Sequence, residues 1–256
     1  MNSENVERIT LFDERYYKIT TENDQVYLPS VTWILNSYPK DIIFNKWLAN
    51  HGWEESEKIK EEAMDRGSKV HNAIEDMLHG AKLTYATPYY SQRSQENVPL
   101  NDNEWKHLIS FTNAWNDLQS RLVVTEREVY SLKYGYGGTV DAILEQNGML
   151  IVADWKTSSG IYPTYTMQIA AYIRAIEEMV PELKGVITEG IIIRTNTRHK
   201  VGYELVSIKD DAIEENFQNF LSVKKIWEID NKDKSPINRE IPKNLSLEVE
   251  KSVIKF

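Results

Sequence analysis

The stretch GTVDAILE-QNG-MLIVADWKT, residues 138–157, decides the fold. Apolar runs on both sides of Asn147-Gly148 are the strongest short-range signal for a β-hairpin. The expected strands are 138–145 and 149–157, and the second is continuously apolar from Ile151 to Ala153, which is typical of a buried strand. We therefore predict the middle of a sheet here, with Asp154 and Lys156 at the end of its buried strand.

Outside this hairpin, hydrophobic spacing and turn residues predict a mixed α/β chain. Ser30 is placed to cap a first helix, and Gly80 to end a long one. Further helices are expected at about 41–50, 54–79, 102–119, 163–180 and 210–230. Strands are expected within 6–28 and at 122–131, 186–194 and 200–208. We predict a loop at 84–103 and a single domain over 1–256, made of an N-terminal accessory region (1–57), a core (58–230) and a polar tail (231–256).

Composition excludes several kinds of protein. The 256 residues include 39 acidic and 30 basic side chains, so the net charge of −9 excludes a wholly basic nucleic-acid binder but leaves room for a local basic track. Cysteine is absent, which excludes disulfides, iron–sulfur clusters and thiol catalysis. The longest apolar runs, such as Ile191–Ile193, are too short to span a bilayer, and the N-terminus lacks the pattern of a secretion signal. We expect a cytoplasmic protein, of a bacterial or phage-infected cell, without a membrane partner.

Charged residues gather where the two hairpin strands meet. Because alternate residues of a strand share a face, Asp154 and Lys156 point the same way, and the hairpin lays Asp141 beside them. Two carboxylates and an ammonium group suit a hard divalent metal such as Mg²⁺. The alternative is an ordinary edge-strand ion pair, which is the better interpretation of an isolated Asp-x-Lys. The buried strand favours a site, because an unpaired buried charge is costly.

Two further patterns accompany this pair. Gly67, His71 and Glu75 form one stripe of the helix 54–79, with a small residue one turn before a metal- or phosphate-binding pair. Gln168 and Tyr172 share a face of the helix 163–180. Each pattern has an ordinary alternative. His71 could be a partly buried histidine without a ligand, and Tyr172 could simply pack in the core.

A third carboxylate is expected on the strand 122–131. Glu126 and Glu128 share one face there, and either could reach the aspartates.

Taken in order, these residues resemble the PD-(D/E)xK nuclease superfamily, and within it the RecB-like exonuclease branch. The matching motifs, over roughly 28–175, are Gly67/His71/Glu75, Glu126, Gly138/Asp141, Asp154/Lys156/Thr157 and Gln168/Tyr172, preceded by the opening Leu28–Leu35. The resemblance implies a restriction-endonuclease-like core, with a central mixed sheet of about four strands flanked by helices.

The resemblance also implies roles for single residues. His71, Asp141, Asp154 and the main-chain carbonyl of Trp155 would hold one or two Mg²⁺ or Mn²⁺ ions. Lys156 would be the catalytic lysine, with Glu126, better aligned than Glu128, as a further catalytic carboxylate. Gln168 and Tyr172 would contact DNA near the scissile phosphate. The branch members with iron–sulfur clusters use four cysteines, so their functions are not expected here.

A DNA strand needs cations for its phosphates and aromatic rings for its bases. Besides Gln168 and Tyr172, the expected DNA-binding residues are Glu75, Tyr136, Arg194, Arg198 and Lys200.

These features predict a metal-dependent DNA exonuclease of end processing, recombination or repair, which favours single-stranded or end-bearing DNA. A helicase, an annealing protein or a single-strand-binding protein is the expected kind of partner. Three alternatives stay open: a structure-specific or flap endonuclease, a non-catalytic DNA-binding subunit, and a metal hydrolase that acts on another phosphoester.

Overall fold

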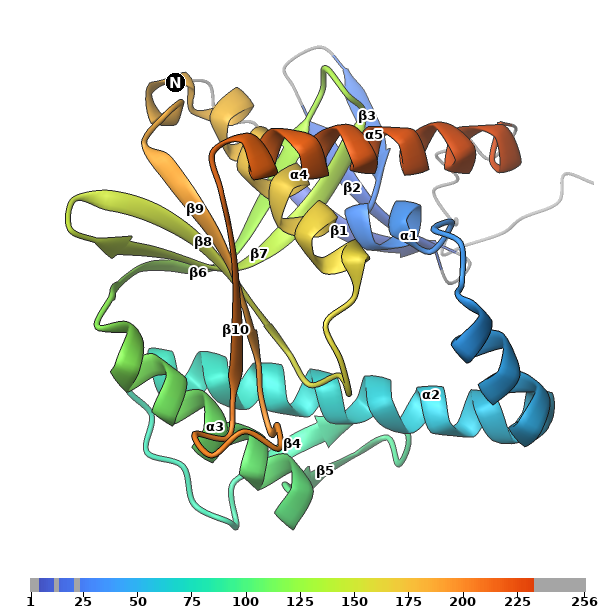
Figure 1. Ribbon diagram of the computed structural model, residues 1–256, viewed down its shortest axis with the longest axis vertical. Helices are drawn as coiled ribbons and strands as arrows, with labels where there is room; N and C mark the ends of the chain where they lie inside the picture. The colour runs from blue at the N-terminus through green and yellow to red at the C-terminus, as the bar shows by residue number, and fades with distance from the viewer. Residues whose placement is uncertain (1–4, 12–13, 21–23, 233–256) are drawn as a thin grey trace, which may run out of the picture.

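The computed structural model of the chain describes residues 5–11, 14–20 and 24–232, so most of the predicted polar tail lies outside the described residues. At its centre is a mixed sheet with strand order β10-β9-β8-β7-β6 (Figure 1). The strands are β6 (Arg121–Ser131), β7 (Tyr136–Gln146), β8 (Met149–Lys156), β9 (Ile187–Arg194) and β10 (Glu204–Lys209). Among these strands, β8 and β9 pair in parallel and the other neighbours are antiparallel. The predicted α/β fold with a mixed sheet is confirmed, but the sheet has five strands where the resemblance implied about four.

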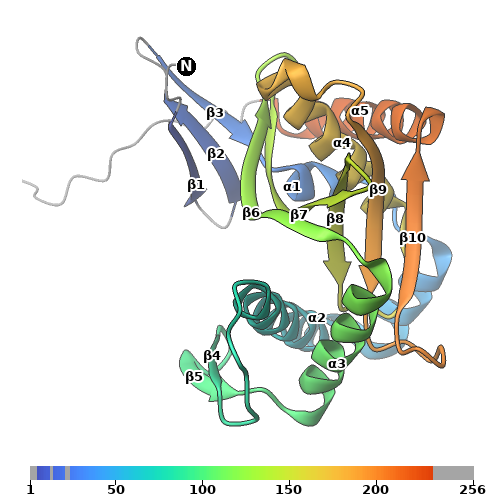
Figure 2. The same cartoon turned by 90° about the vertical axis from the view of Figure 1, so that its left-hand side faces the viewer.

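Helices cover both faces of this sheet. They are α1 (Val31–Leu35), α2 (Ile42–Leu78), α3 (Asp102–Leu118), α4 (Pro163–Met179) and α5 (Asp211–Asp230), with a short 3-10 turn, η1 (Pro181–Leu183). α4 and α5 lie on one face and α2 and α3 on the other (Figures 1 and 2). Val152 of β8 packs in the first layer and Ala153 in the second, so burial on both faces explains the continuous apolar run. Among the described helices, none has the length and apolar character needed to cross a membrane.

The predicted hairpin is β7–β8. Asn147 and Gly148 have φ angles of 54° and 80°, as a two-residue turn that matches the strand twist requires. The register pairs Ala142 with Ala153. The turn therefore fixes which residues of the two strands become neighbours at the other end of the hairpin.

Two predicted helices, 41–50 and 54–79, are joined in α2 across a kink. Gly52 has φ 75° and ψ 171° there, a conformation that glycine adopts far more readily than other residues. The boundary predicted between residues 57 and 58 falls inside α2, so no break in structure separates the accessory region from the core at that point.

The N-terminal strands form a small antiparallel sheet beside β6 and β7 (Figure 2). They are β1 (Asn5–Leu11), β2 (Glu14–Thr20) and β3 (Gln25–Pro29). Ser30 caps α1 as predicted, because its Oγ accepts the Trp33 N–H at 3.1 Å. Gly137 lies so close to Tyr17 that an added Cβ would stand 2.7 Å from the tyrosine Cβ. The glycine therefore lets the small sheet approach the central one.

The loop predicted at 84–103 is wrong, because it contains the hairpin β4 (Pro88–Ser91) and β5 (Glu96–Pro99). A buried carboxylate on α2 organises this hairpin: Oδ1 of Asp65 accepts the Gln92 N–H at 2.7 Å. The sequence does not predict β4 and β5, because such short, polar strands lack the alternation of apolar and polar residues that indicates a strand.

The strand predicted at 200–208 begins only at Glu204. Thr197 N–H donates to Gly202 O at 2.8 Å and closes a turn in the segment before it. The resulting loop, residues 195–203, packs on α3, where Asn113 donates to Val201 O at 3.1 Å.

Candidate active site

Asp141 and Asp154 are neighbours on the antiparallel strands β7 and β8. Asp141 directly precedes Ala142 and Asp154 directly follows Ala153, and these two alanines are paired across the strands. Oδ2 of Asp141 accepts the Trp155 N–H at 3.0 Å. The two aspartates are 8% and 1% exposed, and burial, with the nearby charge of Asp154, raises the pKa of Asp141 well above its ordinary value. The hairpin thus brings two buried carboxylates to one point of the sheet.

The Lys156 ammonium group lies on the same face as Asp154. Its Nζ stands 2.8 Å from Asp154 Oδ2 and donates to Asp154 Oδ1 at 3.0 Å and to Gln168 Oε1 at 3.1 Å. The Tyr165 ring centroid is 4.8 Å away. Burial by itself lowers the pKa of Lys156, but the carboxylates of Asp154 and Asp141 outweigh it and raise that pKa. Lys156 is therefore a cation at neutral pH.

Gln168 and Tyr172 of α4 lie behind these charges. The Gln168 amide donates to Asp154 Oδ1 at 3.1 Å and to the Tyr172 hydroxyl at 3.0 Å. Their exposed fractions are 7% and 3%, and an added Cβ on Gly138 would stand 2.2 Å from the Tyr172 ring. The burial of both side chains corrects their predicted contact with DNA: Gln168 is an internal partner of Asp154 and Lys156, and Tyr172 is an internal partner of Gln168.

A second group of ligand atoms lies on the α2 side. One nitrogen of His71 and one oxygen each of Glu126 and Asp141 all lie within 4.8 Å of one another, and His71 Nδ1 is 3.7 Å from Asp141 Oδ2. Burial, then the charge of Lys156, lowers the pKa of His71 to about 3, against a smaller opposing effect of the Trp155 main chain. The imidazole is thus neutral at pH 7, the form that binds a metal.

Glu126 carries its carboxylate into this group from an irregular point of β6. Its φ of 46° departs from the extended conformation, and Glu126 is the glutamate of this strand that joins the group of ligand atoms. Burial, then the charge of Glu75, raises the pKa of Glu126 to about 7. Glu75, predicted to contact DNA, is half-buried beside these acids, where its carboxylate would repel a phosphate.

The donors fit a hard divalent cation. Oδ2 of Asp154 is buried without a hydrogen bond, although Lys156 Nζ stands within ion-pair distance. Adjacent buried carboxylates with raised pKa values are stabilised when a cation neutralises them. The residues that could hold such an ion are His71, Glu126, Asp141, Asp154 and the main-chain carbonyl of Trp155.

Tyr136 is not a surface ring. It is 0% exposed, and its hydroxyl donates to Ala171 O at 2.9 Å. The ring meets Phe220 edge-on with centroids 4.9 Å apart. The predicted role of Tyr136 in DNA binding is wrong, because an aromatic residue on an apolar strand was packed into the core beneath α5.

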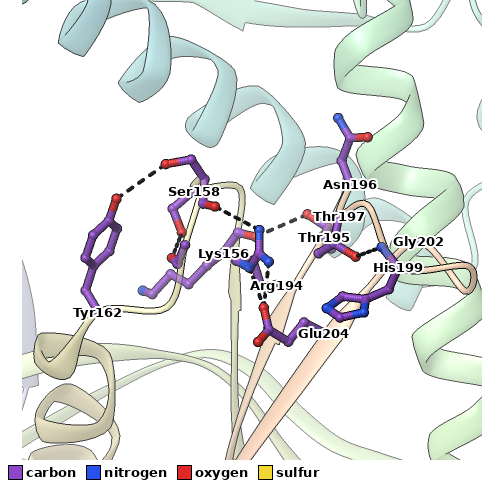
Figure 3. Close-up of polar contacts among 12 residues, drawn as sticks. Lys156, Ser158, Tyr162, Arg194, Thr195, Asn196, Thr197, His199, Gly202 and Glu204 are labelled. Carbon is purple, nitrogen blue, oxygen red and sulfur yellow. Dashed lines mark hydrogen bonds and ion pairs between the residues drawn. The ribbon is translucent and has the colours of Figure 1, made fainter.

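Arg194 is also engaged within the protein. Its Nε and Nη2 donate to Glu204 Oε2 at 2.8 Å and 2.6 Å, and Nη1 donates to Ser159 O at 3.1 Å (Figure 3). The guanidinium group therefore joins the ends of β9 and β10 to the loop after β8. This corrects its predicted role in binding DNA, because its donors are used internally.

Arg198 and Lys200 are exposed on the loop 195–203. Lys200 lines a shallow cavity of about 210 Å³ between this loop and α3, together with Lys106. None of the residues that line this cavity belongs to the carboxylate group, so Lys200 lies outside the candidate metal centre.

Tyr165 is a further neighbour of Lys156, to which the sequence motifs give no role. Its spacing from Gln168 and Tyr172, three and seven residues, places all three on one face of α4. This shared face is the sequence feature that could have indicated a role for Tyr165. Spacing alone, however, does not distinguish a ring that lies over a lysine from a ring that packs in the core.

Three comparisons bear on this arrangement. No family model matches the sequence, and no curated protein matches it. Among solved structures, one described as "Putative exonuclease" from Eubacterium rectale is 13% identical with a TM-score of 0.47, over 85% of this chain and 90% of that one. The alkaline exonuclease LHK-Exo from Laribacter hongkongensis is 10% identical with a TM-score of 0.33, over 80% and 91%. The structure of LHK-Exo in complex with dAMP is 11% identical with a TM-score of 0.37, over 81% of this chain and 92% of that one. These identities and TM-scores are too low to inform on activity. The function has to be inferred from the site itself.

Proposed function

We propose that this protein is a metal-dependent deoxyribonuclease that hydrolyses phosphodiester bonds at DNA ends. One observation carries the proposal: the hairpin gathers buried Asp141 and Asp154 beside the Lys156 cation, with His71 and Glu126 across from them. A buried cluster of this kind costs stability unless a ligand uses it.

His71, Asp141, Asp154, Glu126 and the Trp155 main-chain carbonyl would hold Mg²⁺ or Mn²⁺. The bound metal supplies Lewis-acid polarisation of a phosphoryl oxygen and acidifies a water molecule. The oxygen-rich donor set favours these two ions, and one imidazole is compatible with Mn²⁺.

The side chains around this centre supply charge and orientation. Lys156 is held as a cation by Asp154, so it can stabilise the negative charge that develops on a phosphate. Gln168 bonds both residues at 3.1 Å and fixes the ammonium group relative to the carboxylate. Glu126 adds a third carboxylate to this group, where it would bind the metal or a metal-bound water.

The resemblance of five motifs to RecB-like nucleases supports DNA as the substrate and an end as the starting point. Exposed Arg198 and Lys200 offer phosphate contacts at the periphery. We propose a role in end processing, recombination or repair, with a helicase, annealing or single-strand-binding protein as partner.

The test is degradation of end-labelled linear single- and double-stranded DNA, beside circular DNA, in Mg²⁺, Mn²⁺ or EDTA. We expect metal-dependent loss of linear DNA by the wild type and by the control Lys184→Ala, an exposed lysine after η1. Lys156→Ala should lower the rate of DNA cleavage on the order of 100-fold or more, as expected when one contact to the transition state is removed.

Cutting of circular DNA would identify an endonuclease in its place. Binding of DNA without cleavage in either metal would contradict the catalytic proposal and leave a binding subunit.

A further inference from the structure

The loop between β8 and α4 carries an exposed aromatic ring next to the candidate active site. Tyr162 is 45% exposed. Its ring meets Tyr165 edge-on, with centroids 5.5 Å apart and an interplanar angle of 84°. The Tyr165 ring is 4.8 Å from Lys156 Nζ, and Figure 3 shows the Lys156 side chain extending toward Tyr162. Two rings therefore connect the protein surface with the ammonium group.

Helix capping gives no reason for a tyrosine at this position. Tyr162 is the N-cap of α4, where Ser, Thr, Asp and Asn are preferred because they bond the first amide groups. The Tyr162 side chain makes no capping hydrogen bond. Residues that break a local rule without a gain in stability are often functional.

The surroundings hold this ring in place. Pro163 follows at the first helical position and fixes the backbone, and the Tyr162 hydroxyl lies 3.4 Å from Ser159 Oγ. Ser159 O in turn accepts Arg194 Nη1 at 3.1 Å. A ring on an anchored loop can receive a planar ligand with little loss of conformational entropy.

We infer that Tyr162 stacks on an unpaired nucleobase beside the phosphodiester held at Lys156, and so favours single-stranded ends over paired ones. This inference rests on the proposed nuclease function. Every base has a face on which an aromatic ring can stack, so the contact needs no particular sequence. A base inside a duplex is already covered by its neighbours, so it must leave the stack before the ring can reach it.

Steady-state cleavage of single-stranded and blunt duplex DNA tests the inference with three variants. Tyr162→Ala should raise KM for the single strand on the order of 10-fold, the range of one base–aromatic contact, and leave kcat unchanged. Tyr162→Phe keeps the ring and should behave like the wild type. Tyr85→Ala is the matched control, because Tyr85 is 57% exposed and stacked on Trp105, outside the site. An unchanged KM for Tyr162→Ala, or an equal rise on both substrates, would overturn the inference.

A second readout does not depend on cleavage. A single-stranded oligonucleotide with 2-aminopurine near its end is titrated with protein in EDTA. Wild type and Tyr162→Phe should quench its fluorescence by stacking, and Tyr162→Ala should not. Quenching that depends on Tyr162 in a protein that cleaves nothing would uphold the stacking and reject the nuclease. Binding without such quenching would reject the stacking alone, and absence of both binding and cleavage would reject both.

Discussion

Asp154 is the residue on which both halves of the candidate site depend. Its Oδ1 accepts Lys156 Nζ and Gln168 Nε2, at 3.0 Å and 3.1 Å, while its Oδ2 has no hydrogen bond. Oδ2 nevertheless stands 2.8 Å from the same Nζ, so the ammonium group engages both carboxylate oxygens. Gln168, although buried, fixes this arrangement because it bonds both Asp154 and Lys156.

Gln168→Ala tests this bridging role. We expect kcat to fall by about 10–100-fold, as for partners that orient the groups at a metal site, because Lys156 and Asp154 lose their common tether. KM should change little, since Gln168 does not reach the surface. Steady-state kinetics on labelled DNA is the measurement, with exposed Gln218→Ala of α5 as the control. A rise in KM at unchanged kcat would contradict the role.

Glu126 makes the stability of the metal-free protein depend on pH. Burial and Glu75 raise its pKa from 4.5 to about 7 in the folded state, so the folded protein binds this proton more tightly than the unfolded one. Its favourable contribution is therefore present below pH 4.5 and is lost as the pH rises to about 7.

Glu126→Gln should remove that dependence. In EDTA, the free energy of unfolding of the variant relative to the wild type should increase between pH 4.5 and about 7 and then level off. His71, whose lowered pKa acts in the opposite direction as the pH falls, is present in both proteins. Urea unfolding at a series of pH values checks this, and a constant difference would refute it.

At the scale of elements, β7 and α4 fit together through the absence of a side chain. The Tyr172 ring occupies the space beside Gly138, so a Cβ added to Gly138 would stand 2.2 Å from Cε1 of Tyr172. Such contact brings α4, and with it Gln168, onto the strand that carries Asp141. The glycine of the motif thus serves packing between elements.

Gly138→Ala should therefore be destabilising by about 1–3 kcal/mol, the usual cost of an extra group in a filled core. Gly160→Ala is the matched control, because an added Cβ there meets only the Tyr162 ring at 4.0 Å. Chemical unfolding measures both variants. Equal stability of Gly138→Ala and the wild type would show that α4 can shift away without cost.

At the scale of the whole molecule, a buried ion network connects α2 with α3 and the β4–β5 hairpin. Lys69 Nζ stands 2.7 Å from Glu104 of α3 and 3.3 Å from Asp65 of its own helix, with all three side chains under 10% exposed. Asp65 in turn binds the turn of the hairpin through Gln92 N–H. His71 lies two residues after Lys69, so the same helix carries the network and the site.

Lys69→Ala would leave two buried carboxylates without their cation. We expect a loss of about 3–5 kcal/mol in the free energy of unfolding, as for breaking other buried ion pairs. Lys58→Ala, from the exposed pair with Glu55, should cost less than about 1 kcal/mol. Urea titrations of both variants test this, and similar values for the two would disprove the role of the network.

The sequence alone predicts much of this protein because its signals are local. The Asn147-Gly148 turn sets the register of β7 and β8, and that register places Asp141 beside Asp154. Helical spacing predicts α2 and α4 with their stripes of polar residues. These features depend on periodicity and turn chemistry, which a single segment contains.

Tertiary packing determined which side chains are exposed, and a local sequence pattern does not contain that information. Whether Tyr136, Gln168 and Arg194 face solvent depends on which elements cover them, and in each case a partner distant in the chain buries or binds the side chain. The choice of Glu126 over Glu128 depends on a backbone irregularity opposite Asp141, and the exposure of Tyr162 on the anchoring of its loop. The sequence determined the residue types and the strands that carry them, whereas burial and long-range contacts, which are properties of the packed chain, determined which of those residues can meet a ligand.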